Sequence, residues 1–308
     1  MPTCEICGSN QTEFFHKIEN YSYYQCHNCT ALFLHPRPPL QILTKYYRSD
    51  FEYTAGEANE EQNRLRAGKI LAKLKEFNSR GRKLLDIGSG FGYFLDEANN
   101  LNFRVSGVEP AKKIYKTAIN LRLKTKVKNL SFEKYYERYK SQTFDFITLT
   151  HLIEHIPYPH DFITKVLDLL NPGGILYIET PNLNSRLFKA EKTNYTFLTP
   201  PDHIWLFSLA SLKFLFKKIK RVEILRASSY SQPEHLMGIL KTKLKNTGHG
   251  SKNNSNRPST PSLPMSGYRR GFQNVKYLFF DKLLAPLFTP WLNIGGYGSI
   301  LELYIRKS

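Results

Sequence analysis

The sequence of this 308-residue chain is informative first through what it lacks. No run of about 20 apolar residues occurs, so we expect no membrane-spanning helix. The first residues carry no basic segment followed by an apolar core, so we expect no signal peptide and a cytoplasmic location. No internal repeat is visible, so the pattern does not indicate a repeat architecture.

Cysteine is scarce, and its four copies form two C-x-x-C pairs. In a reducing compartment thiolates bind metal more often than they form disulfides, and tetrahedral zinc takes four such ligands. The spacing of the pairs is typical of a four-thiolate site. We therefore predict a small structural zinc ribbon over residues 1–45, with four reduced thiols as the alternative. The predicted ligands are Cys4, Cys7, Cys26 and Cys29.

The chain also lacks both common phosphate-binding glycine patterns. Residues 84–87 read as a buried strand, which runs into a turn with Gly88, Gly90 and Gly92 and then a helix start. The third glycine comes one residue too early for a dinucleotide turn, and no Lys-Ser/Thr pair follows for a P-loop. Such a strand, turn and helix still form a cradle for a nucleotide-like ligand. Glu109, at the end of the next expected strand, is placed to bind ribose hydroxyls.

The run from Asp86 to Gly92, D-x-G-x-G-x-G, resembles motif I of class I S-adenosylmethionine (SAM)-dependent methyltransferases. This resemblance implies that SAM is the cofactor and that the glycine turn holds it. The residues expected to bind SAM are Asp86, Gly88, Ser89, Gly90, Gly92, Glu109 and Pro110.

Strands and helices alternate through the middle of the chain, which predicts an α/β fold with a doubly wound, mostly parallel, seven-stranded sheet. The expected strands are residues 83–87, 104–108, 125–128, 144–150, 174–180, 222–228 and 300–305. The expected helices are 60–77, 91–100, 111–121, 160–170 and 209–219. We assign residues 46–80 to an aromatic and helical lead-in, 81–230 plus 298–308 to the SAM-binding domain, and 231–297 to a basic, partly disordered insertion. By its resemblance to the methyltransferase fold, the last strand is expected to pair antiparallel with 222–228.

In such sheets ligands gather at the carboxyl ends of the strands, where this chain places several histidines. His151, Glu154 and His155 follow the strand 144–150, and His203 comes later. Glu154-His155 resembles the E-H segment that borders the acceptor pocket in SAM methyltransferases of ubiquinone biosynthesis and sugar modification. Histidine suits proton removal at neutral pH, so His155 is our candidate base, with His203 and His151 as alternatives.

Two other interpretations of these side chains stay open. His155 can simply cap a loop, or the three histidines and Glu154 can together hold a divalent ion. His151 to His155 also matches the H-x-x-E-H zinc motif of inverted peptidases. That motif requires a helix, whereas here it follows a strand and precedes two prolines.

The ribbon joined to this fold is similar to the N-terminal half of deoxysugar C-methyltransferases. Residues 46–53 resemble the segment that approaches the cofactor in those enzymes. We therefore expect methylation of a sugar or glycan, with an RNA methyltransferase or a non-catalytic binding module as alternatives. The net charge of +18 is concentrated in the final third of the chain. Its amphipathic segment 277–288 suits peripheral contact with an anionic membrane on the inner face. Beyond the cysteine pairs no RNA-binding signature appears, so nucleic acid is the less favoured partner.

Overall fold

The computed structural model describes residues 1–48, 60–118, 123, 126–219, 221–232, 235–236, 238–239, 242 and 290–308. The expected disordered stretch at 246–267 and the amphipathic segment 277–288 lie outside these described residues, as does 49–53 of the aromatic lead-in. Among the described residues, no helix is both long enough and apolar enough to cross a membrane.

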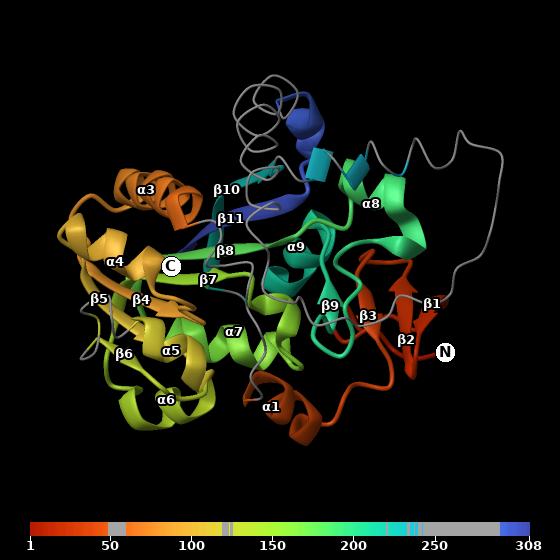
Figure 1. Ribbon diagram of the computed structural model, residues 1–308, viewed down its shortest axis with the longest axis horizontal. Helices are drawn as coiled ribbons and strands as arrows, with labels where there is room; N and C mark the ends of the chain where they lie inside the picture. The colour runs from red at the N-terminus through yellow and green to blue at the C-terminus, as the bar shows by residue number, and fades with distance from the viewer. Residues whose placement is uncertain are drawn as a thin grey trace, which may run out of the picture. The chain divides into compact units, whose positions relative to one another are not determined.

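The predicted seven-stranded sheet is confirmed, with strand order β10-β11-β8-β7-β4-β5-β6 (Figure 1). Its strands are β4 (Lys83–Ile87), β5 (Arg104–Val108), β6 (Val127–Lys128), β7 (Phe144–Thr150), β8 (Leu170–Pro181), β10 (Val222–Tyr230) and β11 (Ile300–Lys307). Strand β4 pairs in parallel with β5 and β7, and β7 pairs in parallel with β8. After β4, the chain adds β5 and β6 on one side of β4 and then β7 and β8 on its other side. Ligands bind at such a reversal point in sheets of this kind.

The last two strands make the sheet mixed. Glu223 on β10 pairs with Arg306 on β11, and Ser228 donates a hydrogen bond to Glu302. Because residue numbers rise on β10 while those of the partners fall, the two strands run antiparallel. The pairing expected for residues 300–305 is therefore present.

Helices cover both faces of the sheet because successive strand residues point to opposite sides. On one face Leu84, Phe146 and Tyr177 form a core with α3 (Glu60–Phe77), α4 (Tyr93–Asn100) and α5 (Lys112–Ala118). On the other face lie α6 (Phe132–Tyr139), α7 (Pro159–Asp168) and α9 (Leu209–Lys217). The sequence patterns missed α6, whose N-cap Ser131 accepts a hydrogen bond from the Lys134 amide.

The N-terminal cysteine region forms a second, four-stranded sheet with order β1-β2-β3-β9. Its first three strands are β1 (Thr12–Ile18), β2 (Tyr21–Cys26) and β3 (Leu32–Leu34), which α1 (Leu40–Arg48) follows. The fourth, β9 (Trp205–Leu206), comes from far along the chain and pairs antiparallel with β3. The buried residues of this region join the core beneath α7 and α9, so it packs as part of the same compact unit.

Residues 184–196 and 229–300 form a second compact unit. Its described elements are α8 (Arg186–Glu191), η3 (Lys192–Asn194) and η5 (Ile294–Gly296). Within this unit the Arg186 guanidinium lies 4.6 Å from the ring centre of Trp291 and 5.5 Å from that of Tyr297.

Candidate active site

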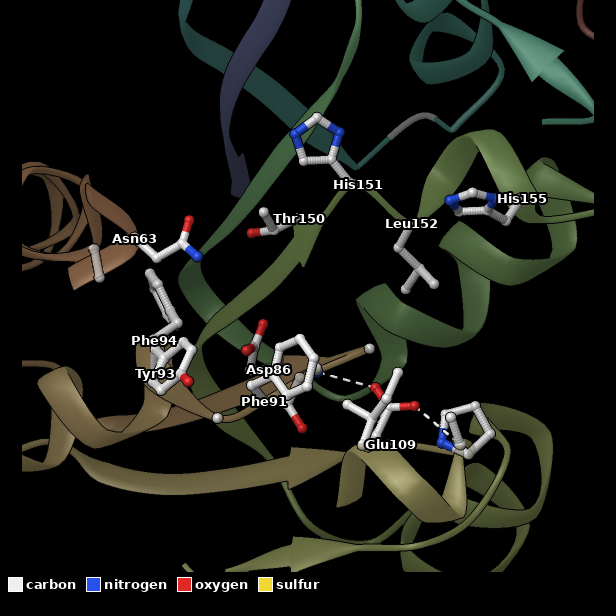
Figure 2. A pocket seen from close by; sticks show the side chains of 18 of the residues that line it. Asn63, Asp86, Phe91, Tyr93, Phe94, Glu109, Thr150, His151, Leu152 and His155 are labelled. Carbon is white, nitrogen blue, oxygen red and sulfur yellow. Dashed lines mark hydrogen bonds between the residues drawn. The ribbon is translucent and has the colours of Figure 1, made fainter. Parts of the chain in front are cut away.

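The glycine turn between β4 and α4 forms one wall of a cavity of about 290 Å³ (Figure 2). The φ angles of the turn are +74° at Gly88, +53° at Gly90 and +85° at Gly92. Residues other than glycine rarely adopt such positive values. A Cβ on Gly92 would lie 3.0 Å from side-chain carbons of Ala118 and Leu123, whereas one on Gly90 would meet nothing within 4 Å. The turn thus packs tightly on the protein side and leaves open space at Gly90.

Glu109 braces this turn from the end of β5. Its two carboxylate oxygens accept hydrogen bonds from the Gly90 amide at 2.9 Å and from the Ala111 amide at 2.8 Å. Each carboxylate oxygen keeps a second lone pair, so the group can still accept a ligand hydroxyl. Glu109, which the sequence predicts to bind ribose hydroxyls, and Pro110, predicted to bind SAM, both line the cavity.

Asp86 lies on the floor of the cavity as a buried carboxyl. Thr148 on β7 donates a hydrogen bond to Asp86 Oδ1 at 2.6 Å. Burial nevertheless raises the pKa of Asp86 to about 7, and the nearby charge of Glu109 adds to the rise. A carboxyl of this kind carries a proton over part of the physiological pH range.

Two buried hydroxyls on the cavity wall have no hydrogen-bond partner within the described part of the chain. They are Ser89 Oγ in the glycine turn and Thr150 Oγ1 at the end of β7. Buried polar atoms are normally satisfied, so orphaned ones in a cavity point to a bound ligand. Together with the open space at Gly90, they fit the polar and sugar parts of SAM.

His151 begins the turn after β7 with a φ of +49°, which is uncommon for a residue other than glycine. Its ring lies between two buried carboxylates, with Nε2 at 2.9 Å from Glu179 Oε1 and Nδ1 at 3.4 Å from Glu154 Oε1. Glu179 also pairs with Arg66 of α3, a cavity-lining residue. These polar contacts join the helix α3 to the sheet beside the cavity.

His155 is positioned by η2 (Ile153–His155), a single 3-10 turn, and lines the cavity with Asp202. Figure 2 shows His151, Leu152 and His155 along one side of the cavity and Asp86 and Glu109 along the other. His155 Nδ1 lies 2.9 Å from Asp202 Oδ1 and 3.1 Å from the Asp202 carbonyl oxygen. Because both neighbours are acceptors, Nδ1 carries the proton and Nε2 is the basic nitrogen of the neutral ring.

Burial and neighbouring charges shift the pKa values of His155, His203 and Glu154 in different directions. Burial alone would lower the pKa of His155, but the charge of Asp202, its hydrogen bond and Glu154 raise it to about 9. Burial and the neighbouring His155 charge lower the pKa of His203 to about 4. Burial opposes ionisation of Glu154, yet the His151 hydrogen bond and the histidine charges lower its pKa to about 2. These shifts favour the cationic form of His155 and the neutral form of His203.

Glu154, His155 and His203 offer ligand atoms within 4.8 Å of one another, a spacing that would admit a divalent ion. Glu154 and His203 are buried and are absent from the cavity lining, where only His155 of the three is found. His203 Nδ1 donates to the Phe197 carbonyl at 2.7 Å, and Thr180 donates to Glu154 Oε2 at 2.9 Å. We interpret Glu154 and His203 as residues that hold His155 in place at the cavity.

Four cysteine sulfurs come together in the N-terminal sheet, as the two C-x-x-C pairs predict. The Sγ atoms of Cys4 and Cys29 are 3.6 Å apart, and those of Cys7 and Cys26 are 3.5 Å apart. A tetrahedral zinc with bonds of about 2.3 Å would separate its sulfurs by roughly 3.8 Å. The cysteines form no disulfide, so the donor set and its spacing fit zinc.

The structure adds site residues that the sequence patterns did not single out. Asp202, Arg66, Thr148 and Thr150 all contribute to the cavity or to the groups that line it. The two threonines belong to the strand that leads into His151, so their position at its carboxyl end is the one signal that points to them. Arg66 and Asp202 come from other segments, and their roles depend on the tertiary fold.

Comparison with known proteins agrees with this site. Residues 59–219, more than half of the chain, match the family described as Methyltransferase domain. The ubiquinone biosynthesis O-methyltransferase of Nitrosococcus oceani is 30% identical over 112 residues, which are 35% of this chain and 47% of that protein. The enzyme of the same name from Paracidovorax citrulli is 29% identical over 134 residues, 42% of this chain and 54% of that protein. The chain thus spans about half the length of the curated relatives it matches.

Solved structures share the fold. A SAM-dependent methyltransferase from Archaeoglobus fulgidus superposes with a TM-score of 0.52 at 17% identity, over 84% of this chain and all of that one. The plantazolicin methyltransferase BpumL, solved with S-adenosylhomocysteine and a triazolic desmethylPZN analogue, gives a TM-score of 0.51 at 14% identity, over 86% of this chain and 95% of that one.

The expectation of a sugar or glycan acceptor is wrong by these comparisons. The named relatives are ubiquinone biosynthesis O-methyltransferases, and the ribbon that prompted the sugar prediction lies outside the region of family similarity. The four cysteines are also absent from the lining of the cavity, so they carry no information about the acceptor. The glycine turn, the sheet and the family match lead to one conclusion: the chain belongs to the methyltransferase-domain family and has the fold of SAM-dependent methyltransferases.

Proposed function

We propose that this protein transfers the methyl group of SAM to a hydroxyl group of a small organic molecule. The observation that carries the proposal is the His155–Asp202 pair on the wall of the cavity that the glycine turn also lines. One cavity is therefore lined both by the residues expected to bind the cofactor and by a hydrogen-bonded acid–base pair. The names of the curated relatives, which are O-methyltransferases, support oxygen as the methylated atom.

The residues around the glycine turn bind the cofactor. Glu109 accepts hydrogen bonds from the ribose hydroxyls, in addition to those from the Gly90 and Ala111 amides. Ser89 and Thr150 provide the hydroxyls that have no other partner in the described structure. SAM, when bound, supplies an electrophilic methyl group and leaves as S-adenosylhomocysteine.

His155 acts as the general base toward the acceptor hydroxyl. Asp202 holds Nδ1–H, so that Nε2 accepts the hydroxyl proton as the oxygen forms its bond to the methyl carbon. The resulting imidazolium is stabilised by the charges of Asp202 and Glu154. Alignment of the two reactants in one cavity supplies the remainder of the acceleration.

The cavity favours an acceptor with an apolar or aromatic body. Its wall includes Phe91, Phe94, Ile70 and Leu152, so a planar ring or chain can be buried while its hydroxyl approaches His155. Hydroxylated aromatic compounds are accordingly the first class to test.

The experiment measures S-adenosylhomocysteine release from SAM and a panel of hydroxylated aromatic acceptors. We expect turnover that His155→Gln lowers by about 100-fold or more, the usual contribution of a general base. His160→Gln is the matched control, because His160 is exposed on α7. SAM affinity should be equal in all three proteins. Turnover that survives His155→Gln would reject the base assignment, and transfer only to nitrogen or carbon acceptors would reject O-methylation.

We propose further that the four cysteines hold one structural zinc ion. Their sulfur spacing and their soft thiolate chemistry support this assignment. All four positions of the metal would be filled by protein, so the ion would stabilise the N-terminal sheet without touching the acceptor.

A further inference from the structure

The cysteine region reaches the candidate base through the segment 202–206. Strand β9 completes the four-stranded sheet, and it directly follows Asp202, His203 and Ile204. Its register pairs Leu32 with Leu206 and Phe33 with Trp205. The partner of His155 therefore lies three residues before a strand that belongs to the cysteine region's own sheet.

The contacts on that side are specific and buried. Leu34 donates its amide to the Ile204 carbonyl at 2.9 Å, and the rings of Phe33 and Trp205 are tilted against each other with centroids 5.5 Å apart. Trp205 is only 1% exposed. These contacts fix the backbone immediately after Asp202 and His203.

Tyr23 of β2 makes the most direct link. Its side chain is fully buried, and its hydroxyl donates a hydrogen bond to the His203 carbonyl at 2.8 Å. Burial raises the pKa of Tyr23 strongly, and the charge of Asp202 contributes to the same rise. Tyr23 thus holds the peptide between His203 and Ile204, next to the acidic partner of His155 in the chain.

The other side of the segment is held by the histidine turn itself. The Ile204 amide donates to the Glu154 carbonyl at 2.9 Å. The segment 202–204 is therefore clamped between β2 and β3 on one side and η2 on the other. A small movement of this segment would change the distance from Asp202 to His155.

We propose that Tyr23 is a positioning residue for methyl transfer, through which the cysteine region holds Asp202 against His155. This inference rests on the proposed function for its catalytic meaning, but the coupling itself can be measured without an acceptor. Among the described residues, Asp202, Glu154 and His203 face His155, and His151 lies in the same turn. Of these, Asp202 and His203 belong to the segment that Tyr23 holds.

The experiment follows the imidazole resonances of His155 by NMR as a function of pH, in the full chain, with His155→Gln used to assign the signal. In Tyr23→Phe we expect the His155 midpoint to fall by about half a pH unit or more, because Asp202 moves away and stabilises the imidazolium less. SAM affinity, measured by calorimetry, should change less than twofold, because Tyr23 is absent from the cavity lining.

Tyr24→Phe is the matched control. Tyr24 is the next residue on β2, and its ring packs against Phe14, Phe33 and His35. The Tyr24→Phe variant also loses one hydroxyl oxygen and should leave the midpoint of the His155 titration unchanged. Phe33→Leu, which weakens the contact with Trp205, should lower the midpoint in the same direction and decides the question if Tyr23→Phe does not fold.

An unchanged midpoint in the folded Tyr23→Phe protein, or an equal shift in Tyr24→Phe, overturns the inference. If the midpoint shifts as expected but no hydroxyl acceptor is ever methylated, the proposed function fails while the coupling stands. If methyl transfer is found, Tyr23→Phe should lower kcat and move its pH profile, with little effect on KM for SAM.

Discussion

His155 Nδ1 lies 2.9 Å from Oδ1 of Asp202, although 47 residues separate the two in the chain. The same nitrogen is also within 3.1 Å of the Asp202 carbonyl oxygen. One residue therefore fixes both the orientation of the imidazole and its charge. This double contact makes Asp202 the first position to test.

Asp202→Asn should change the pH dependence of methyl transfer. The pKa of His155, raised to about 9, means that the neutral ring needed to accept a proton is a minor form at pH 7. The wild-type rate should thus rise with pH through about 9. Without the negative charge the midpoint should move to lower pH, and the maximal rate should fall about tenfold or more as the ring loses its orientation. The pH profile of kcat checks this, and an unshifted midpoint would contradict it.

Asp86→Asn should flatten the pH dependence of stability. The folded-state pKa of about 7 lies above the ordinary 3.8, so between these values the folded protein binds a proton that the unfolded chain releases. The free energy of unfolding of the wild type should therefore fall as pH rises from about 4 to 7, by up to about 4 kcal/mol. Urea unfolding without SAM at pH 5 and pH 8 measures it. The slope should shrink in the variant, with a remainder from Glu109, whose pKa burial also raises. Equal slopes would show that Asp86 is ionised throughout.

Two glycine substitutions should separate packing from ligand binding. In Gly92→Ala the new Cβ lies 3.0 Å from Ala118 Cβ in a left-handed conformation, so we expect a loss of about 2–4 kcal/mol in unfolding free energy. Gly90→Ala meets no protein atom within 4 Å and should lose only about 1 kcal/mol. Because Gly90 lines the cavity, that variant should instead weaken SAM binding by about tenfold or more. Denaturant titration and calorimetry provide the two readouts, and unaltered SAM affinity in Gly90→Ala would contradict the placement of the cofactor.

The cysteine site should contain one zinc ion per chain by elemental analysis. A strong chelator, or Cys26→Ser, should remove the metal and lower the melting temperature by about 5 °C or more, because a closed thiolate site contributes directly to folding. His27→Gln is the control, since His27 lies beside Cys26 and its side chain is half exposed and paired with Glu13. A metal-free protein of unchanged melting temperature would mean that the four thiols are merely reduced neighbours.

The sheet could be predicted well because each strand carries its own signal. Residues 83–87, 104–108 and 144–150 were expected with the observed bounds, since apolar runs there are bounded by turn residues. Helix α6 was missed because its residues are mostly aromatic and charged and bury only Phe132 and Tyr135. Strand β9 has two residues, too few for any periodic pattern.

That the glycine turn lines the cavity could also be predicted, because its residues follow one another along the first strand and turn. The wall that contains His155 and Asp202 could not, because it depends on residues brought together from separate segments. Asp202 lies in a loop, where no neighbouring sequence pattern indicates that it pairs with His155. Arg66 lies in a helix whose charged residues are typical of a solvent-exposed face. The acceptor class was predicted wrongly from the cysteine pairs, which lie outside the cavity lining.

The pairing of β3 with β9 has a consequence for biosynthesis. Tyr23 and the carbonyl it binds are 180 residues apart in the chain. A ribosome adds about 5–20 residues per second, so the cysteine region emerges many seconds before the strand that completes its sheet. During that interval β3 presents an unpaired edge, which is a known risk for aggregation. A metal bound early by the four cysteines would give this exposed sheet its order until the rest of the chain arrives.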